Sequence, residues 1–217
     1  MIKKKLLKNA KKIDKFLINF LKKQKKSLLV KPMKYGIISG GKKIRSTIIF
    51  DTGKIFNIKE KKLLNICAAV ECIHSYSLIH DDLPCMDNDS MRRGKPSTHI
   101  KFGEASAVLA GSSLLTLAFE IIADKKYLLN TKIKNEIIKS LASCSGHTGI
   151  AEGQELDLKF ENKKKKINQI IDMQKKKTGK LFNFCLHSVG SVANKTHKEK
   201  LFLSNIGEEI GLLFQLA

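Results

Sequence analysis

The sequence carries an acidic cluster close to the point where one predicted helix must end: Asp81, Asp82, Asp87 and Asp89. Carboxylates packed this closely repel one another unless a cation lies among them, and their hard oxygen atoms suit Mg²⁺ or Ca²⁺. Because Pro84 cannot continue a helix, the first two aspartates are expected at a helix C-terminus, whose partial negative charge favours a cation further. Asp87 must then return over them in a loop. We interpret the cluster as a candidate metal site, with a solvated acidic loop as the alternative.

Basic residues flank this cluster on both sides. Arg92 and Arg93 follow it directly, either as ion-pair partners of the aspartates or as ligands of an anion that the metal bridges, since Mg²⁺ together with arginine suits a diphosphate. Upstream, the segment Gly40-Gly-Lys-Lys-Ile-Arg45 combines two glycines with the start of a predicted helix, which can offer its N–H groups to an anion. Its spacing is not that of the nucleotide-binding P-loop. It is a candidate phosphate cradle.

A third basic segment lies far downstream, at Gln174-Lys-Lys-Lys-Thr-Gly-Lys180. Lys177 could bind a phosphate through its charge, and Thr178 through its hydroxyl group. In a chain so rich in lysine, a solvated charged face is an equally good interpretation of the same residues.

Apolar residues recur at helical spacing along most of the chain, which predicts an all-α fold. On one predicted helix, Glu71, His74 and Leu78 share a face with the first aspartates. A loop is expected at 90–103, and glycines at 146, 149 and 153 interrupt the chain after 145. We predict one domain over residues 1–217, an antiparallel bundle of about nine or ten helices. Eight of these helices are expected at about 2–24, from Pro32 to the Gly40–Gly41 break, and at 42–56, 59–83, 104–123, 130–145, 166–190 and 197–217.

Composition limits the function classes. The chain has 217 residues, enough for one sizeable core, and a net charge of 41 − 20 = +21. Such a charge attracts polyanions, but compositional drift towards lysine is the interpretation we favour for most of these residues. Five cysteines without a paired spacing suggest reduced thiols in a cytoplasm. The N-terminus is a poor secretory signal, and the longest uncharged run, 105–119, is short for a membrane span, so no stable membrane insertion is expected.

Taken in order, the motifs resemble those of the trans-isoprenyl diphosphate synthases, and most closely the bacterial farnesyl diphosphate synthase type. The motifs are Gly-Gly-Lys-x-x-Arg, Asp-Asp-x-x-x-x-Asp followed by Arg-Arg-Gly, and Lys-Thr-Gly, and the similarity extends from Met33 to Gln215. The resemblance implies the isoprenoid synthase helical bundle, Mg²⁺ as cofactor, and a homodimer. It also implies a prenyltransferase that condenses isopentenyl diphosphate with dimethylallyl or geranyl diphosphate to give geranyl or farnesyl diphosphate.

The resemblance also implies a role for each matching residue. The allylic diphosphate would be held by Mg²⁺ on Asp81, Asp82 and Asp87, assisted by Arg92, Lys177 and Thr178. Isopentenyl diphosphate would be bound by Gly41, Lys42, Arg45, His74 and Arg93. Gln154 and Gln215 match further polar positions of the cavity. Tyr76, about 7–8 Å along the helix from Asp81, and its neighbour Ser77 would form the floor that limits the product to C15 or C10; the alternative for Tyr76 is a core tyrosine.

The chain departs from the family pattern in three places. Lys43 stands where arginine is usual, and Ser46 where proline is usual. The second Asp-Asp-x-x-Asp motif should follow Phe214-Gln215, but the sequence stops at Ala217. The bundle is therefore expected to lack its C-terminal helices, and one carboxylate wall of the site.

Three functions remain open at this point. The chain is a truncated or decaying synthase, a non-catalytic partner subunit of another synthase, or a basic protein that binds nucleic acid. The intact first acidic motif argues against the second, and the absence of a recognition module or an aromatic stacking motif argues against the third. We therefore expect no nucleic-acid partner, Mg²⁺-dependent binding of an allylic diphosphate, and little turnover.

Overall fold

The helical periodicity of the sequence produces a chain built almost entirely of helices, which confirms the predicted all-α class. The computed structural model describes residues 2–23, 27–38 and 40–216. The chain forms two compact units, Met1–Thr47 with Leu64–Asp124 and Ile48–Leu63 with Lys125–Ala217. That the two units act as one domain stays a prediction.

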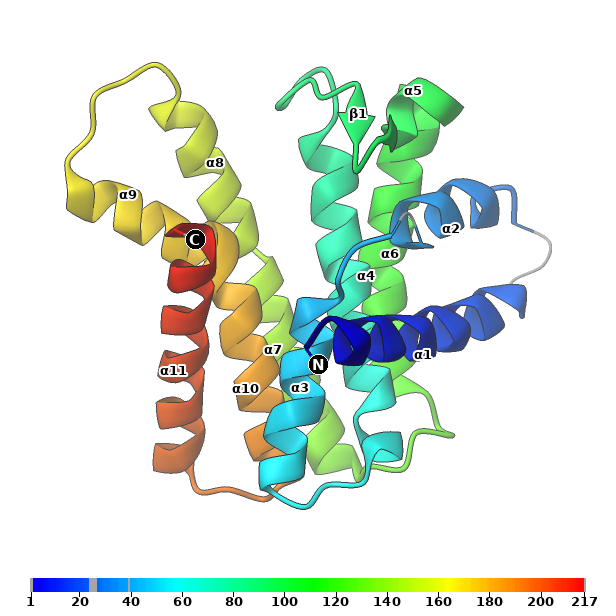
Figure 1. The fold of residues 1–217 in the computed structure, drawn as a ribbon, viewed down its shortest axis with the longest axis vertical. Coiled ribbons are helices and arrows are strands. Elements are labelled where there is room, and N and C mark those ends of the chain that lie inside the picture. Colours follow the sequence, from blue (N-terminus) through cyan, green and yellow to red (C-terminus); the bar gives the residue numbers. More distant parts are fainter. Residues whose placement is uncertain (1, 24–26, 39, 217) are drawn as a thin grey trace. The chain divides into compact units, whose positions relative to one another are not determined.

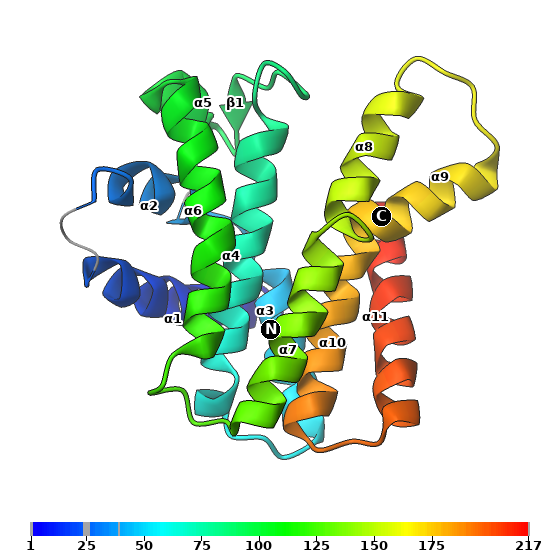
Figure 2. The same cartoon turned by 180° about the vertical axis from the view of Figure 1, so that it is seen from behind.

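The first unit is organised around two long helices that run side by side, α4 (Leu64–Asp81) and α6 (Glu104–Ala123) (Figures 1 and 2). A small residue of α6 allows this close approach, since a methyl group at Gly111 would lie 2.3 Å from Nε2 of His80 on α4. Helix α1 (Ile2–Lys22) runs across α4 and buries its apolar face. The unit also contains α2 (Val30–Ile38), α5 (Thr98–Phe102) and the hairpin of β1 (Met91–Arg92) with β2 (Lys95–Pro96).

Helix α6 is long and apolar enough to cross a membrane, by length and composition alone. This is weak support for a membrane span, because the core helix of a soluble protein has the same properties. Its inner face is buried in the first unit, whereas Val108 and Leu109 on its outer face are 41% and 53% exposed.

Helix α3 (Ile44–Ile55) begins in the first unit and continues into the second. In the second unit, α10 packs against both α7 and α11. Glycines on α11 allow this helix to approach α10 closely, since a methyl group at Gly207 would lie 2.5 Å from the carbonyl oxygen of Phe182 on α10. The elements of this unit are the 3₁₀ turn Glu60–Lys62, α7 (Thr131–Ser145), α8 (Ile150–Phe160), α9 (Ile167–Gln174), the π turn Lys175–Gly179, α10 (Lys180–Val192) and α11 (His197–Leu216).

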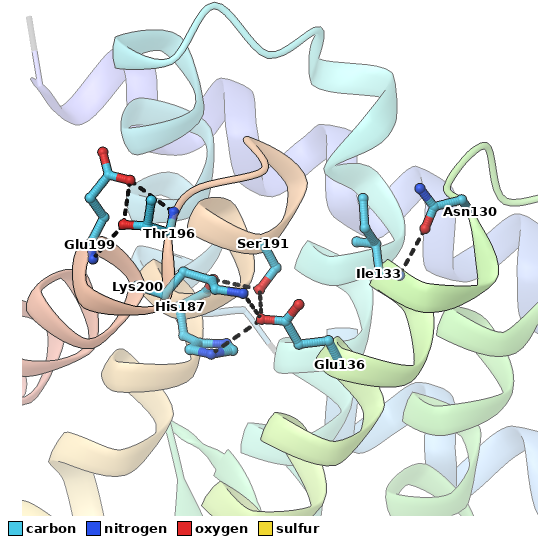
Figure 3. A network of polar contacts seen from close by, with 8 residues as sticks. All are labelled: Asn130, Ile133, Glu136, His187, Ser191, Thr196, Glu199 and Lys200. Carbon is cyan, nitrogen blue, oxygen red and sulfur yellow. Dashed lines mark hydrogen bonds and ion pairs between the residues drawn. The ribbon is translucent and has the colours of Figure 1, made fainter.

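A polar network joins three helices of the second unit around the carboxylate of Glu136 on α7 (Figure 3). Ser191 of α10 donates to Oε1 of Glu136 at 2.9 Å, and Nζ of Lys200 on α11 donates to the same oxygen. His187 Nε2 lies 3.7 Å from it. Burial raises the pKa of Glu136, but the hydrogen bonds from Lys200 and Ser191 outweigh burial and lower that pKa overall. The charged carboxylate therefore ties α7, α10 and α11 together.

Three sequence expectations needed correction or refinement. The predicted loop at 90–103 contains the short hairpin and α5, which are too brief to show a period. The glycine-rich stretch after 146 contains α8, in which Gly153 lies inside a helix rather than at a break. The helix expected at 166–190 is divided by the π turn. The other predicted helices are confirmed to within a few residues, while the predicted ends at 24 and 217 lie outside the described residues.

Candidate functional site

The acidic loop folds back on the end of α4. The helix ends at Asp81, and the backbone N–H of Asp87 donates to the carbonyl oxygen of Asp81 at 2.9 Å. Asn88, with a φ of 52°, takes the left-handed conformation that asparagine tolerates, and its N–H donates to Leu83 O. The predicted return of Asp87 over the helix end is therefore confirmed, and Asp81 and Asp87 lie together.

Asp82 forms an ion pair with an arginine. Its carboxylate is buried, and its Oδ1 accepts two hydrogen bonds from Arg92, from Nε at 2.9 Å and from Nη2. The same Nη2 donates to Asp89 at 2.9 Å. Burial raises the pKa of Asp82, and the hydrogen bond from Arg92 opposes that rise. Asp82 and Arg92 therefore form a partly buried ion pair beneath the loop.

This arrangement bears on the predicted magnesium site. Within the part of the chain that the structure describes, no three His, Cys, Asp or Glu side chains are grouped as metal ligands. Asp81 and Asp87 nevertheless supply hard oxygen donors at one helix end, the chemistry that Mg²⁺ prefers. The residues therefore fit Mg²⁺ through Asp81 and Asp87, while Asp82 is engaged by Arg92. The three-aspartate ligand set stays a prediction.

The glycine-rich loop lies before α3 and has an unusual backbone. Gly40 and Gly41 have φ angles of 92° and 103°, and Lys43 has a φ of 46°. A methyl group at Gly41 would lie 2.7 Å from Nη1 of Arg93, and that Nη1 donates to Gly40 O at 2.7 Å. Arg93 is thus held against the glycine loop, whereas Arg92 is held by the aspartates. Lys42, the predicted phosphate ligand, is exposed.

His74 lies near the cations of the first unit. Burial lowers its pKa well below 6.5, and the positive charges of Arg45, Arg93, Lys43 and Arg92 lower it further. His74 is therefore neutral at pH 7 and can donate a hydrogen bond without adding charge. A neutral imidazole beside these cations is an arrangement that favours an anionic ligand.

The depressed pKa of His74 predicts how stability depends on pH. Below about pH 6.5 His74 is protonated in the unfolded chain but stays neutral in the folded chain. The free energy of unfolding should therefore fall by about 1.4 kcal/mol per pH unit because of this group, until the pH reaches the pKa of His74 in the folded state. Urea denaturation between about pH 7 and pH 5 should give a shallower dependence for His74→Gln than for the wild type. An equal slope in the two proteins would contradict the assignment. The pKa of His187 is also lowered, chiefly by burial, and both proteins keep this contribution.

Tyr76 and Ser77 lie one to two turns before the acidic loop. The Tyr76 ring packs edge-to-face on His80 with centroids 4.9 Å apart, and His80 Nε2 lies 3.1 Å from Val108 O on α6. Burial raises the pKa of Tyr76, and the nearby charge of Asp81 adds to the rise. Ser77 Oγ donates to His74 O at 3.1 Å. Tyr76 is thus fixed near Asp81, and its role in product length stays a prediction.

The remaining predicted residues belong to the second unit. Thr178 Oγ1 donates to Gln215 Oε1 at 3.2 Å, and Lys177 Nζ donates to the carboxylate of Asp157 on α8. The π turn contains both Lys177 and Thr178, and such turns occur frequently at functional sites. Gln154 is buried on α8.

Asp157 is a residue that sequence reasoning missed. It lies three residues after Gln154, so the two share a face of α8, but the helix itself was not predicted there. Glu71 is a second residue without a predicted role, although the sequence places it on the face of His74 on a predicted helix. It lies buried beneath the glycine loop.

Sequence comparison places these residues among known proteins. The profile of the Polyprenyl synthetase family matches residues 26–217. The farnesyl diphosphate synthase of Escherichia coli strain K12 is 42% identical over 190 residues, which cover 87% of this chain and 64% of that protein. The farnesyl diphosphate synthase of Bacillus subtilis strain 168 is 37% identical, with 87% and 64% covered. The chain thus spans just under two thirds of the length of these relatives.

Solved structures show the same relationship. An FPP/GFPP synthase from Zymomonas mobilis superposes with a TM-score of 0.91 and 38% identity, over 99% of this chain and 78% of that one. A geranyltransferase from Legionella pneumophila gives a TM-score of 0.88 and 34% identity, over 99% and 77%. The predicted bundle type is therefore confirmed, and the chain is shorter than both structures.

Proposed function

Because this chain belongs to the polyprenyl synthetase family, we propose that it is a prenyltransferase, which condenses isopentenyl diphosphate with dimethylallyl or geranyl diphosphate. The observation that carries the proposal is the pair of opposed environments in the first unit. Asp81 and Asp87 lie together at the end of α4, and about two turns earlier the positive charges of nearby arginines and Lys43 lower the pKa of His74 beyond the effect of burial. Such a pair suits a metal-bound diphosphate beside a second diphosphate held by cations alone.

The first environment would bind the allylic diphosphate. Asp81 and Asp87 are the residues that would hold Mg²⁺, which supplies charge neutralisation of the leaving diphosphate. Arg92 fixes Asp82 beneath the loop and presents its cation next to the leaving group. Lys177 and Thr178 are proposed to assist from the π turn, where Asp157 and Gln215 hold them before a ligand binds.

The second environment would bind isopentenyl diphosphate through Lys42, Arg45, Arg93 and the N–H of neutral His74. The double bond of this substrate attacks the allylic carbon as the diphosphate departs, and a proton is then lost to the released diphosphate. No protein nucleophile is needed. The side chains position the two substrates, balance their charge and exclude water from the cation.

An equilibrium measurement tests the proposal without requiring turnover. Geranyl diphosphate should bind the purified chain more tightly with Mg²⁺ than with EDTA, and isopentenyl diphosphate should bind with no metal requirement. Labelled isopentenyl diphosphate then reports whether condensation occurs. Failure of both diphosphates to bind would overturn the proposed function.

Tyr76 is proposed to limit product length. The expected result of Tyr76→Ala is a shift of the product distribution from C15 towards longer chains, because removal of the aromatic ring opens space beside Asp81. The test is chromatography of the dephosphorylated products of an actively condensing preparation, and Ser77→Ala in the same assay measures how much Ser77 contributes to the proposed floor. An unchanged product distribution would remove Tyr76 from this role.

We also propose that the protein is a cytoplasmic homodimer. The apolar outer face of α6, with Val108 and Leu109 exposed, is the surface that a second copy of the chain would cover. Analytical ultracentrifugation tests this directly, and Leu109→Asp should shift the protein towards monomer. A wild-type chain that sediments as a monomer at all concentrations would exclude the dimer.

A further inference from the structure

A buried polar network lies beneath the glycine loop. The side chains of Lys43 and Glu71 are 3% and 2% exposed, and Ser46 is fully buried. Ser46 Oγ donates to Glu71 Oε1 at 2.7 Å, and the Ser46 backbone N–H donates to the same oxygen at 3.4 Å. Lys43 Nζ lies 3.6 Å from Glu71 Oε2 and donates to Ile37 O at 2.8 Å. Through these bonds α4 holds both the loop and the first turn of α3.

Burial excludes direct contact between these groups and a ligand in solution. A buried ion pair is also a poor source of stability, because desolvation offsets most of its attraction. The network does impose a conformation, since it draws the Lys43 side chain inwards from a backbone with a φ of 46°. Its neighbour Lys42 is left on the exposed side of the loop.

Glu71 also balances charge around the loop. Burial lowers the pKa of Arg93, and the negative charge of Glu71 is the largest opposing influence. Asp14 on α1 lies 3.8 Å from Lys43 Nζ, and burial raises its pKa. A carboxylate beneath the loop therefore reduces the repulsion among Lys43, Arg93 and the other cations while no anion is bound.

We propose that Glu71 is a positioning residue, which acts through Ser46 and Lys43 to hold the glycine loop in its anion-binding conformation before the ligand arrives. The inference rests on the proposed function, in which this loop binds the diphosphate of isopentenyl diphosphate. A loop that is already ordered loses less conformational entropy on binding, so the network raises affinity without touching the ligand.

The direction in which Glu71→Gln changes diphosphate affinity distinguishes a positioning role from a purely electrostatic one. If Glu71 acted only through its charge, Glu71→Gln would remove a negative group near the anion site and tighten diphosphate binding. If Glu71 positions the loop, the same substitution weakens binding by about tenfold or more. Glu104→Gln is the matched control. It also removes one carboxylate from the first unit, but Glu104 is exposed and lies far from the glycine loop in the sequence.

A second variant separates positioning from general loss of stability. Lys43→Met leaves Glu71 as a buried carboxylate without its cation, which should destabilise the fold strongly. The double variant Lys43→Met with Glu71→Gln removes both charges and should recover most of the lost melting temperature. The inference requires the double variant to be folded and still weak in binding. Recovery of binding together with melting temperature would overturn it.

The measurement is calorimetric titration of each folded variant with isopentenyl diphosphate and, separately, with inorganic diphosphate. Weaker binding of both ligands by Glu71→Gln supports the inference, and unchanged or tighter binding overturns it. If the wild type binds inorganic diphosphate but not isopentenyl diphosphate, the proposed substrate is wrong, and the variants still decide the role of Glu71 with the inorganic ligand. Binding of neither ligand by the wild type overturns both statements.

Discussion

Replacement of both Asp81 and Asp87 by asparagine should remove the Mg²⁺-dependent part of geranyl diphosphate binding, a loss of about 100-fold in affinity. The amide keeps the size of each side chain but not the negative charge that a hard divalent cation requires. The backbone bond from Asp87 N–H to Asp81 O does not involve either side chain, so the loop should keep its shape. Binding with and without Mg²⁺ is the measurement.

Asp89 supplies the matched control in the same loop. It is exposed and bonded to Arg92, and Asp89→Asn removes one charge without touching the proposed metal ligands. This variant should keep most of the enhancement by Mg²⁺. If Asp89→Asn loses about half of the binding free energy that the double variant loses, the loop attracts cations only through its total charge, since one charge is removed in place of two. If the double variant keeps the enhancement, Mg²⁺ is held elsewhere.

Gly153→Ala should destabilise the second unit by about 3 kcal/mol, at the upper end of overpacking effects. The added methyl group would lie 2.1 Å from the backbone nitrogen of Lys177 and 2.4 Å from its Cα. Because both atoms belong to backbone, the π turn itself must shift, and Lys177 and Thr178 with it. The expected result is therefore a lower denaturation midpoint.

Helix propensity alone predicts that Gly153→Ala stabilises the protein, by about 1 kcal/mol. Ala151→Gly at an exposed position of the same helix measures that propensity term and should cost about 1 kcal/mol with no effect on ligand binding. A stabilised Gly153→Ala protein would show that α8 and the π turn do not approach as closely as described.

The sequence was informative where a signal is local. Long periodic segments such as Glu104–Ala123 were predicted with correct ends, because the apolar repeat directly reflects burial on one face. The return of Asp87 followed from Pro84, which limits the helix. The family was predicted from the order of four short motifs and is confirmed by the match over residues 26–217.

The sequence was least informative where contacts distant in sequence decide the structure. Gly153 was interpreted as an interruption because glycine disfavours helices, yet it lies in α8 opposite the backbone of Lys177. Asp82 stays a predicted metal ligand, and only the fold shows that its carboxylate accepts hydrogen bonds from Arg92. Ser46 was noted only as a departure from proline, whereas its hydroxyl and its backbone N–H both donate to Glu71. None of these partners is visible in local sequence.

The cations around His74 have a thermodynamic consequence for the ligand. In the free protein, Arg45, Arg93 and their neighbours help to keep the imidazole unprotonated. A diphosphate placed among them, as proposed, reverses the local field, and the proton affinity of His74 rises. Proton uptake and anion uptake then reinforce each other, because two processes that share an electrostatic field must be reciprocal. Mild acidification should therefore tighten anion binding at the same time as it loosens the fold.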